Sequence, residues 1–171
     1  DEVGPVLAIE DMLELMSDGC EFVSCTRYAY GGRRLGGSLI GQILSRTANR
    51  LFHAVSGCAL TDATTGIKLM RRDVYYKLDL NARPVGWAVA FEMSMKAQMA
   101  GLRLGEVPII SIDRLYGGAS TFRVGPWMVE YLRWFLWGSI HLRKMARVSR
   151  SSVAVRATSG VPLAAQVVRH G

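Results

Sequence analysis

Segments with helical periodicity alternate with short extended segments along this chain, and this alternation constrains the fold more than any other sequence feature. Apolar residues recur at helical spacing in four segments, at residues 5–17, 39–55, 87–101 and 126–145. Short runs that suit strands lie between them, at residues 21–26, 67–70 and 102–112. The pattern predicts an α/β fold, with a further helical turn at 73–78. The strands are too few for a complete doubly wound sheet.

The composition is that of one globular domain. The 171 residues are 50% hydrophobic, which suffices for a buried core and excludes wholesale disorder. No run approaches the roughly 20 apolar residues that cross a bilayer, and no secretory signal pattern opens the sequence. The chain starts at Asp1 without an initiator methionine, so we expect a processed product or a fragment. The cysteines fit no metal-ligand spacing, and we expect buried thiols in a reducing compartment at Cys20, Cys25 and Cys58.

The net charge of +7 is unevenly distributed. Residues 1–26 contain seven acidic residues and no lysine or arginine, whereas residues 114–171 contain nine basic residues and one acidic residue. A cationic C-terminal third is typical of proteins with an anionic partner, such as phosphates, nucleic acid or a membrane surface. A basic face that is merely solvated explains the charge equally well.

Glycine interrupts the pattern at residues 30–37, where four of eight residues are glycine and two are arginine. We expect a mobile basic loop there, without a regular secondary-structure element. From Val148 onward the chain has no sustained periodicity, and we expect a weakly ordered basic tail.

Four short motifs occur in order along the chain. They are CTRY at 25–28 before the glycine-rich segment, DATTGIKLMRR at 62–72, GW at 86–87 followed by FEM at 91–93, and GEVPI at 105–109 leading to DRLYGGAST at 113–121. As an ordered set they resemble the C-terminal half of family 2 glycosyltransferases, especially the dolichol- or polyprenyl-phosphate sugar synthases. The resemblance covers roughly residues 1–145.

The resemblance implies a partial GT-A fold, a mixed sheet with flanking helices, and an enzyme that moves a mannose-like hexose from a nucleotide sugar to a polyprenyl or dolichyl phosphate. It implies a peripheral location at the cytoplasmic face of a membrane, with no nucleic acid as partner. In the family, the nucleotide-binding region and an Asp-rich metal motif lie in the other half of the catalytic domain. We therefore expect a divalent metal, Mg²⁺ or Mn²⁺, for the full-length enzyme, no metal ligand in this chain, and no activity of the isolated chain.

The acceptor phosphate is expected to meet basic residues around the glycine-rich segment. A lipid phosphate already carries nucleophilic oxygens near neutral pH, so it needs positioning and charge screening more than a general base. The family places an acceptor-phosphate arginine at Arg27, whose guanidinium can present a fork to phosphate. The resemblance adds Ser45 and Arg46. The family often has arginines where this chain has Gly41 and Gln42, and Arg33 or Arg34 are candidates to replace them.

Two carboxylates are candidate catalytic residues. Asp62 opens a turn that borders the active site in the family, although an Asx turn that satisfies nearby backbone N–H groups explains it equally well. Glu92 lies on an otherwise apolar helical segment, where a buried carboxylate needs a partner. It either anchors the core through an arginine or orients the donor site.

Two arginines near the second glycine pair are the donor-side candidates. The family's arginine in this segment reaches the nucleotide diphosphate, and the match is Arg114. The usual lysine after Ser120 is absent, and Arg123 is the candidate substitute.

The segment from Pro126 holds many aromatic residues beside cations: Trp127, Tyr131, Trp134, Phe135, Trp137, Arg133, Arg143 and Lys144. An aromatic stripe is usually core, but basic amphipathic helices with Trp and Tyr also lie in the membrane interface, and we expect the interfacial arrangement. The predicted organisation is an acceptor-side half-domain at 1–124, an interfacial helix at 125–147 and the tail at 148–171. The alternative to an enzyme is a non-catalytic basic module that binds a membrane surface or nucleic acid.

Overall fold

A computed structural model describes residues 3–36, 39–81, 88–112, 124–148 and 155–157. Its main sheet has four strands in the order β3-β1-β4-β6, formed by Phe22–Thr26 (β1), Lys68–Met70 (β3), Leu104–Pro108 (β4) and Val155–Ala157 (β6). β1 is antiparallel to β3 and parallel to β4, which is parallel to β6. The predicted α/β class, with a mixed sheet and flanking helices, is therefore confirmed. Strand β6 lies within the segment expected to be weakly ordered, most of which is outside the described residues.

A second, two-stranded sheet joins Arg33–Leu35 (β2) to Ile110–Ile112 (β5) in parallel. The expectation that the glycine-rich segment lacks a regular element is wrong. Gly32 explains how the strand forms, because an added Cβ would lie 2.8 Å from the carbonyl oxygen of Thr26. Only glycine lets the chain pass this close to the end of β1 before Arg33 donates its backbone N–H to the carbonyl oxygen of Ile109 at 3.0 Å.

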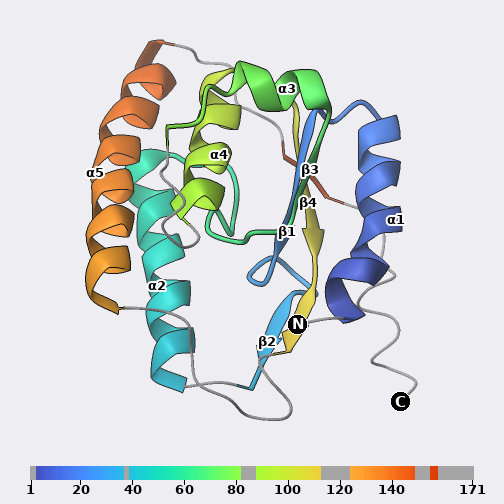
Figure 1. Ribbon diagram of the computed structural model, residues 1–171, viewed down its shortest axis with the longest axis horizontal. Helices are drawn as coiled ribbons and strands as arrows, with labels where there is room; N and C mark the ends of the chain where they lie inside the picture. The colour runs from blue at the N-terminus through green and yellow to red at the C-terminus, as the bar shows by residue number, and fades with distance from the viewer. Residues whose placement is uncertain (1–2, 37–38, 82–87, 113–123, 149–154, 158–171) are drawn as a thin grey trace.

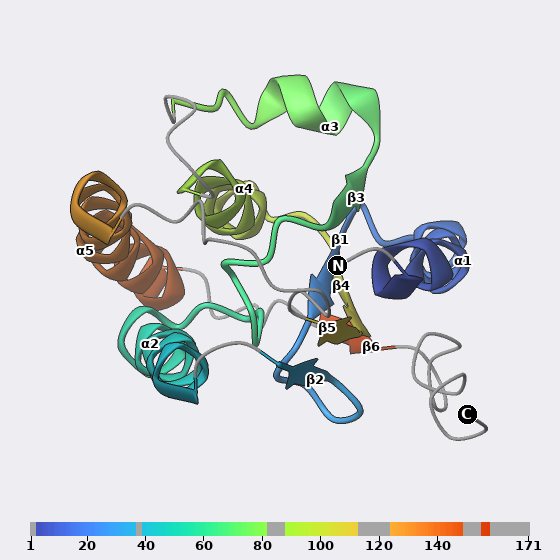
Figure 2. The ribbon, with the colours of Figure 1, turned by 60° about the horizontal axis from the view of Figure 1, so that its bottom comes forward.

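Helices cover both faces of the main sheet (Figures 1 and 2). One face carries α1 (Val3–Ser17), and the other carries α2 (Leu39–Ser56), α4 (Ala88–Met99) and α5 (Val124–Val148), with α3 (Arg72–Lys77) following β3. On the α1 face, Ala8, Met12 and Leu15 pack against buried residues of β1 and β4. The three cysteines are free and buried, as predicted. Burial raises the pKa of the Cys25 and Cys58 thiols to about 12, so both stay protonated at neutral pH.

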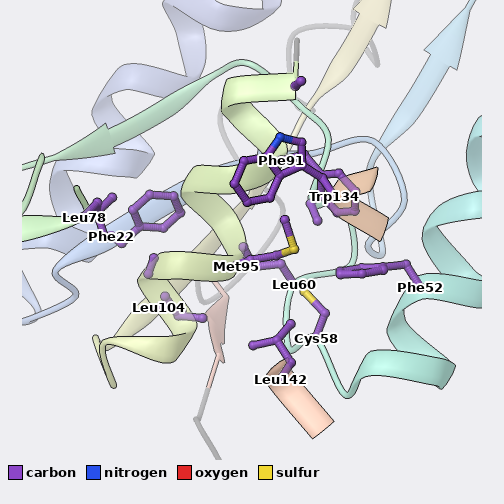
Figure 3. Close-up of a cluster of buried hydrophobic side chains, with 13 residues drawn as sticks. Phe22, Phe52, Cys58, Leu60, Leu78, Phe91, Met95, Leu104, Trp134 and Leu142 are labelled. Atoms are coloured by element: carbon purple, nitrogen blue, oxygen red, sulfur yellow. The ribbon is translucent and has the colours of Figure 1, made fainter. Parts of the chain in front are cut away.

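The larger core lies between the sheet and the three helices of the other face (Figure 3). Phe52 of α2, Phe91 and Met95 of α4, and Trp134 of α5 belong there to one cluster with Phe22 of β1. The rings of Phe52 and Phe91 pack edge to face, with their centroids 4.7 Å apart. The Phe52 ring also packs against the Phe135 ring of α5, with their centroids 5.2 Å apart, so it joins α2 to α5 as well.

Helix α5 presents Tyr131, Trp134, Phe135 and Trp137 to this core and not to the exterior. Trp134 is 6% exposed, and Tyr131, Phe135 and Trp137 pack against the same cluster. These four rings are thus core, which corrects their expected interfacial arrangement; the side chain of Trp127 lies outside the described residues. The exposed face of α5 is aliphatic, with Met128, Val129, Leu132, Leu136 and Ile140 each more than half exposed.

Helix α2 also turns much of its apolar face outward. Leu39, Ile40, Ile43 and Leu44 are between 63% and 74% exposed, whereas its buried residues are Asn49, Phe52 and Ser56. Because α2 and α5 pack against each other, the two exposed faces belong to neighbouring elements. Among the helices of the described ranges, none combines the length and the hydropathy that crossing a membrane requires.

Candidate functional site: an arginine-lined pocket

A half-open pocket of about 260 Å³ lies between the segment that follows β1, strand β2 and the first turns of α2. Four arginines line it: Arg27, Arg33, Arg34 and Arg46. No acidic residue is among the lining residues in the part of the chain that the structure describes. Four arginines along one concave surface make it positive, which favours a phosphate or another compact anion.

The rest of the lining combines polar and apolar groups. Tyr28 and Gln42 contribute polar side chains, and Leu35 and Ile43 contribute apolar ones. The Gln42 amide donates to the carbonyl oxygen of Gly36 at 2.5 Å, tying α2 to the end of β2. Arg33 and Arg34 thus share a pocket with Gln42. Gln42 is one of the two positions at which the family resemblance led us to expect an arginine. Ile43 belongs both to the pocket and to the exposed apolar face of α2.

Arg27 is held by Asp62 in a two-point ion pair. Its Nε donates to one carboxylate oxygen at 2.6 Å and its Nη2 to the other at 3.0 Å. The Arg27 side chain is 17% exposed and lines the pocket, whereas the Asp62 side chain is fully buried. The structure therefore brings these two predicted site residues together, with Asp62 fixing the guanidinium plane of Arg27.

Asp62 also organises its own turn. Its carboxylate accepts hydrogen bonds from the backbone N–H of Thr64 at 3.3 Å and from the Thr64 hydroxyl at 3.0 Å. The first of these is the Asx-turn contact that the sequence suggested. The two alternatives for Asp62, an Asx turn and a position beside the candidate site, are therefore compatible. The turn that Asp62 stabilises borders the arginine pocket through Arg27.

Ser45 lies on α2 beside the pocket, where its hydroxyl oxygen accepts a hydrogen bond of 2.6 Å from the Tyr28 hydroxyl. One turn later, Asn49 donates to Thr64 Oγ1 and accepts from the Ala63 backbone N–H. Sequence reasoning missed Asn49. The available signal was an asparagine on the apolar side of a predicted helix, because a buried amide requires specific hydrogen-bond partners.

Glu92 is fully buried on α4 and is not among the lining residues of the pocket. Its carboxylate pairs with Lys96 one turn later at 2.9 Å and accepts the Asn81 backbone N–H at 2.6 Å. These contacts anchor α4 to the segment after α3. This is the alternative in which Glu92 anchors the core, although its partner is a lysine and not an arginine. The donor-side candidates Arg114 and Arg123 lie outside the described residues.

A second group of buried polar residues adjoins the site. Lys68 donates to the hydroxyls of Ser24 at 3.0 Å and Ser94 at 2.8 Å. Burial lowers the pKa of the Lys68 ammonium to about 8 and raises the pKa of the Glu106 carboxyl to about 7. Within the described ranges, no group of three or more His, Cys, Asp or Glu side chains could hold a metal ion.

No protein-family model matches the chain. Over 129 residues, 70% of this chain and 49% of the relative, it is 29% identical to the polyprenol monophosphomannose synthase of Mycolicibacterium smegmatis. Over 125 residues, 68% of this chain and 51% of the relative, it is 31% identical to the undecaprenyl-phosphate mannosyltransferase of Micrococcus luteus. The chain is a distant homologue of these polyprenyl-phosphate mannosyltransferases. It spans about half the length of the curated relatives it matches.

Proposed function

We propose that this chain forms the acceptor side of a glycosyltransferase that transfers a mannose-like hexose from a nucleotide sugar to a polyprenyl monophosphate. The arginine pocket carries the proposal, because it joins a cluster of guanidinium groups to an apolar surface at Ile43. A polyprenyl phosphate has the matching chemistry, an anionic head on an apolar chain. The names of both relatives specify a polyprenyl substrate and mannose transfer.

In this proposal the pocket orients the phosphate and screens its charge. A phosphate oxygen attacks the anomeric carbon of the sugar, and the nucleotide leaves with its diphosphate. The phosphate supplies the nucleophile itself, so the protein contributes mainly position, and orientation accounts for much of the rate. Arg27, held in plane by Asp62, is the fixed donor of the pocket, whereas Arg33 and Arg46 are exposed and can adjust to the ligand.

A divalent metal, Mg²⁺ or Mn²⁺, is part of the proposal for the full-length enzyme. The described residues of this chain do not gather a ligand set for it, so its ligands would come from elsewhere in the protein. The donor nucleotide sugar would be bound by residues elsewhere in the protein together with Arg114 and Arg123 of this chain.

A membrane surface is the proposed location, at its cytoplasmic face. Aliphatic residues are exposed on the neighbouring helices α2 and α5, and the first turns of α2 line the pocket. Exposed basic residues flank these faces: Arg46, Arg50, Arg133, Arg143 and Lys144. Each basic residue near an anionic leaflet adds about 1 kcal/mol of binding free energy. A lipid phosphate would thus enter the pocket from the membrane surface to which the protein binds.

The test is a transferase assay with the full-length protein, a nucleotide sugar, a divalent metal and a polyprenyl phosphate. Arg46→Ala should raise the KM for the lipid about tenfold, the effect of losing one charge-assisted hydrogen bond. Arg50→Ala is the matched control, since Arg50 is equally exposed one turn later on α2 but does not line the pocket. Absence of any sugar-lipid product would reject the proposal, as would an equal effect of the two substitutions.

A second assay separates this function from that of a basic binding module. Flotation with anionic liposomes and a gel shift with RNA are compared on the same protein. Liposome binding without RNA binding is expected. RNA affinity that falls steeply with salt would instead favour a nucleic-acid-binding module.

A further inference from the structure

Glu106 is a buried carboxylate for which the proposed reaction has no role. It lies in the middle of β4, in register with Ser24 of β1, and is 3% exposed. Its neighbours Gly105 and Val107 face α1, so Glu106 faces the α2 and α4 side of the sheet. A buried carboxylate is unfavourable unless its oxygens are hydrogen-bonded, so its partners show what it stabilises.

The first set of partners is the start of the Asp62 turn. One carboxylate oxygen of Glu106 accepts the backbone N–H of Thr61 at 2.8 Å and that of Asp62 at 3.4 Å. The Thr61 hydroxyl lies 3.1 and 3.0 Å from the two oxygens and donates to them. Glu106 thus holds the backbone from which Asp62 projects toward Arg27.

The second set is reached through Thr61. A hydroxyl has a single hydrogen, and Thr61 uses its own toward Glu106. In the 2.7 Å contact between the Thr61 and Thr26 hydroxyls, Thr26 is therefore the donor. The Thr26 oxygen is left to accept the backbone N–H groups of Tyr28 at 3.1 Å and Ala29 at 3.3 Å. These two residues begin the segment that leads into the pocket.

We propose that Glu106 is a positioning residue of the arginine pocket: through Thr61 and Thr26, its ionised carboxylate holds the Arg27–Tyr28 segment in register with the Asp62 turn. We call the two successive hydroxyl bonds, from Thr26 to Thr61 and from Thr61 to Glu106, the relay. Both hydroxyls donate toward Glu106 because an ionised carboxylate only accepts hydrogen bonds. The inference about the relay concerns this chain alone. Its consequence for lipid binding rests on the proposed function.

Protonation of Glu106 would reverse the relay. A neutral carboxyl donates to Thr61, which must then donate to Thr26. The Thr26 oxygen has two lone pairs and would face three donors, so a bond to Tyr28 or Ala29 is lost. The charged groups around Glu106 are Asp62 of the adjoining turn and Lys68 of β3, and the Cys58 thiol lies near it. Since burial raises the pKa of Glu106 to about 7, the reversal falls close to neutral pH.

The test follows the backbone amides of Tyr28 and Ala29 in the full-length protein by ¹⁵N NMR and hydrogen exchange between about pH 5.5 and 8.5. In the wild type their shifts should titrate with a midpoint near pH 7. Glu106→Gln donates an amide hydrogen to Thr61 and so mimics the protonated state. It should abolish the titration and speed exchange of these amides about tenfold at pH 8, the effect of losing one hydrogen bond. Glu21→Gln is the control, because Glu21 is partly exposed and pairs with Arg103 at the other end of β1.

Thr61→Val provides a second route, useful if Glu106→Gln does not fold. It removes the hydroxyl of the relay and keeps the Glu106 contacts to the backbone N–H groups of Thr61 and Asp62. The Thr26 oxygen then faces only the Tyr28 and Ala29 donors at any pH, so the titration of these two amides should disappear while the Asp62 amide stays protected. The positioning role is overturned if the Tyr28 and Ala29 amides of either variant titrate and exchange as in the wild type.

Farnesyl phosphate binding to the same samples separates this inference from the proposed function. Glu106→Gln should weaken binding about tenfold at pH 8 and leave it near the wild-type value at pH 6, where wild-type Glu106 is itself mostly protonated. The comparison at each pH cancels the titration of the ligand. A wild type whose Tyr28 amide titrates but which binds no farnesyl phosphate would reject the proposed function and retain the relay.

Discussion

The site has a buried region and an exposed region, and they contribute differently. In the buried region, the carboxylates of Asp62 and Glu106 accept hydrogen bonds from Arg27, Thr64 and Thr61 and fix the backbone. In the exposed region, Arg33 and Arg46 supply charge at the surface of the pocket. The buried region determines geometry at some expense in stability, because buried charges are desolvated. In the proposed function the exposed region sets the affinity for an anion, since Arg33 and Arg46 have no acidic partner among the described residues.

The strongest test of this division is the buried ion pair. Asp62→Asn keeps the size of the side chain but removes the carboxylate charge that pairs with the Arg27 guanidinium. We expect it to lower the free energy of unfolding by about 3 kcal/mol, the usual effect of breaking a buried pair from one side. Urea unfolding measures this loss. Arg46→Ala, in the exposed region, should unfold within about 0.5 kcal/mol of the wild type; a similar loss in both variants would remove the distinction.

Sequence reasoning predicted the elements whose signals are local. The helices and the strands β1, β3 and β4 follow from periodicity in their own residues. Strand β2 was missed because it depends on pairing with β5, far along the chain, and because glycine-rich segments usually break regular structure. The orientation of α5 was also missed. Its aromatic residues and its aliphatic residues such as Leu132 both recur at helical spacing, so periodicity does not tell which face is buried.

The site was predicted in part for the same reason. Arg27 and Asp62 follow from motifs and Arg46 from the family resemblance, and the structure brings Arg27 and Arg46 to one pocket. Glu106 was part of a motif, yet its role depends on Thr61 and Thr26, which only the fold brings next to it.

The pH dependence of stability gives the second prediction. The pKa of Glu106 is about 7 in the native state against 4.5 in the unfolded chain. Between these two pH values the native state therefore binds more protons than the unfolded chain. Its contribution to stability is therefore complete below pH 4.5, is lost as the pH rises toward 7, and is constant above that, a change of at most about 3 kcal/mol. Thermal unfolding across this range should show the wild type losing stability relative to Glu106→Gln as the pH rises. Parallel curves for the two proteins would contradict the desolvation of Glu106.

A third prediction concerns Gly32, where the buried and exposed regions meet. In Gly32→Ala the new Cβ would lie 2.8 Å from the Thr26 carbonyl oxygen and 2.9 Å from the Arg27 carbonyl carbon. The segment that carries Arg33 must shift, so we expect farnesyl phosphate affinity to fall about tenfold, by roughly 1.4 kcal/mol. Calorimetric titration measures it. Unchanged affinity would mean that the pocket does not depend on this close approach.

The smallest expected effect lies on the surface beside the pocket. Leu44→Asp on α2 and Val6→Asp on α1 both replace an aliphatic residue that is 63% exposed, on opposite faces of the sheet. Leu44→Asp should reduce binding to anionic vesicles several-fold, by about 1 kcal/mol or more, because it removes apolar contact and adds repulsion. Val6→Asp should leave binding unchanged. Equal effects would exclude the α2 face as the membrane-facing surface.

The central claim, that the arginine pocket recognises the phosphate of a polyprenyl phosphate, is tested most directly by calorimetric titration of farnesyl phosphate and of farnesol into the full-length protein. We predict that the wild type and Arg50→Ala bind farnesyl phosphate alike, that Arg46→Ala binds it about tenfold more weakly, and that farnesol does not bind measurably. Farnesol binding as tight as that of farnesyl phosphate, or the same affinity in Arg46→Ala and Arg50→Ala, would contradict the claim.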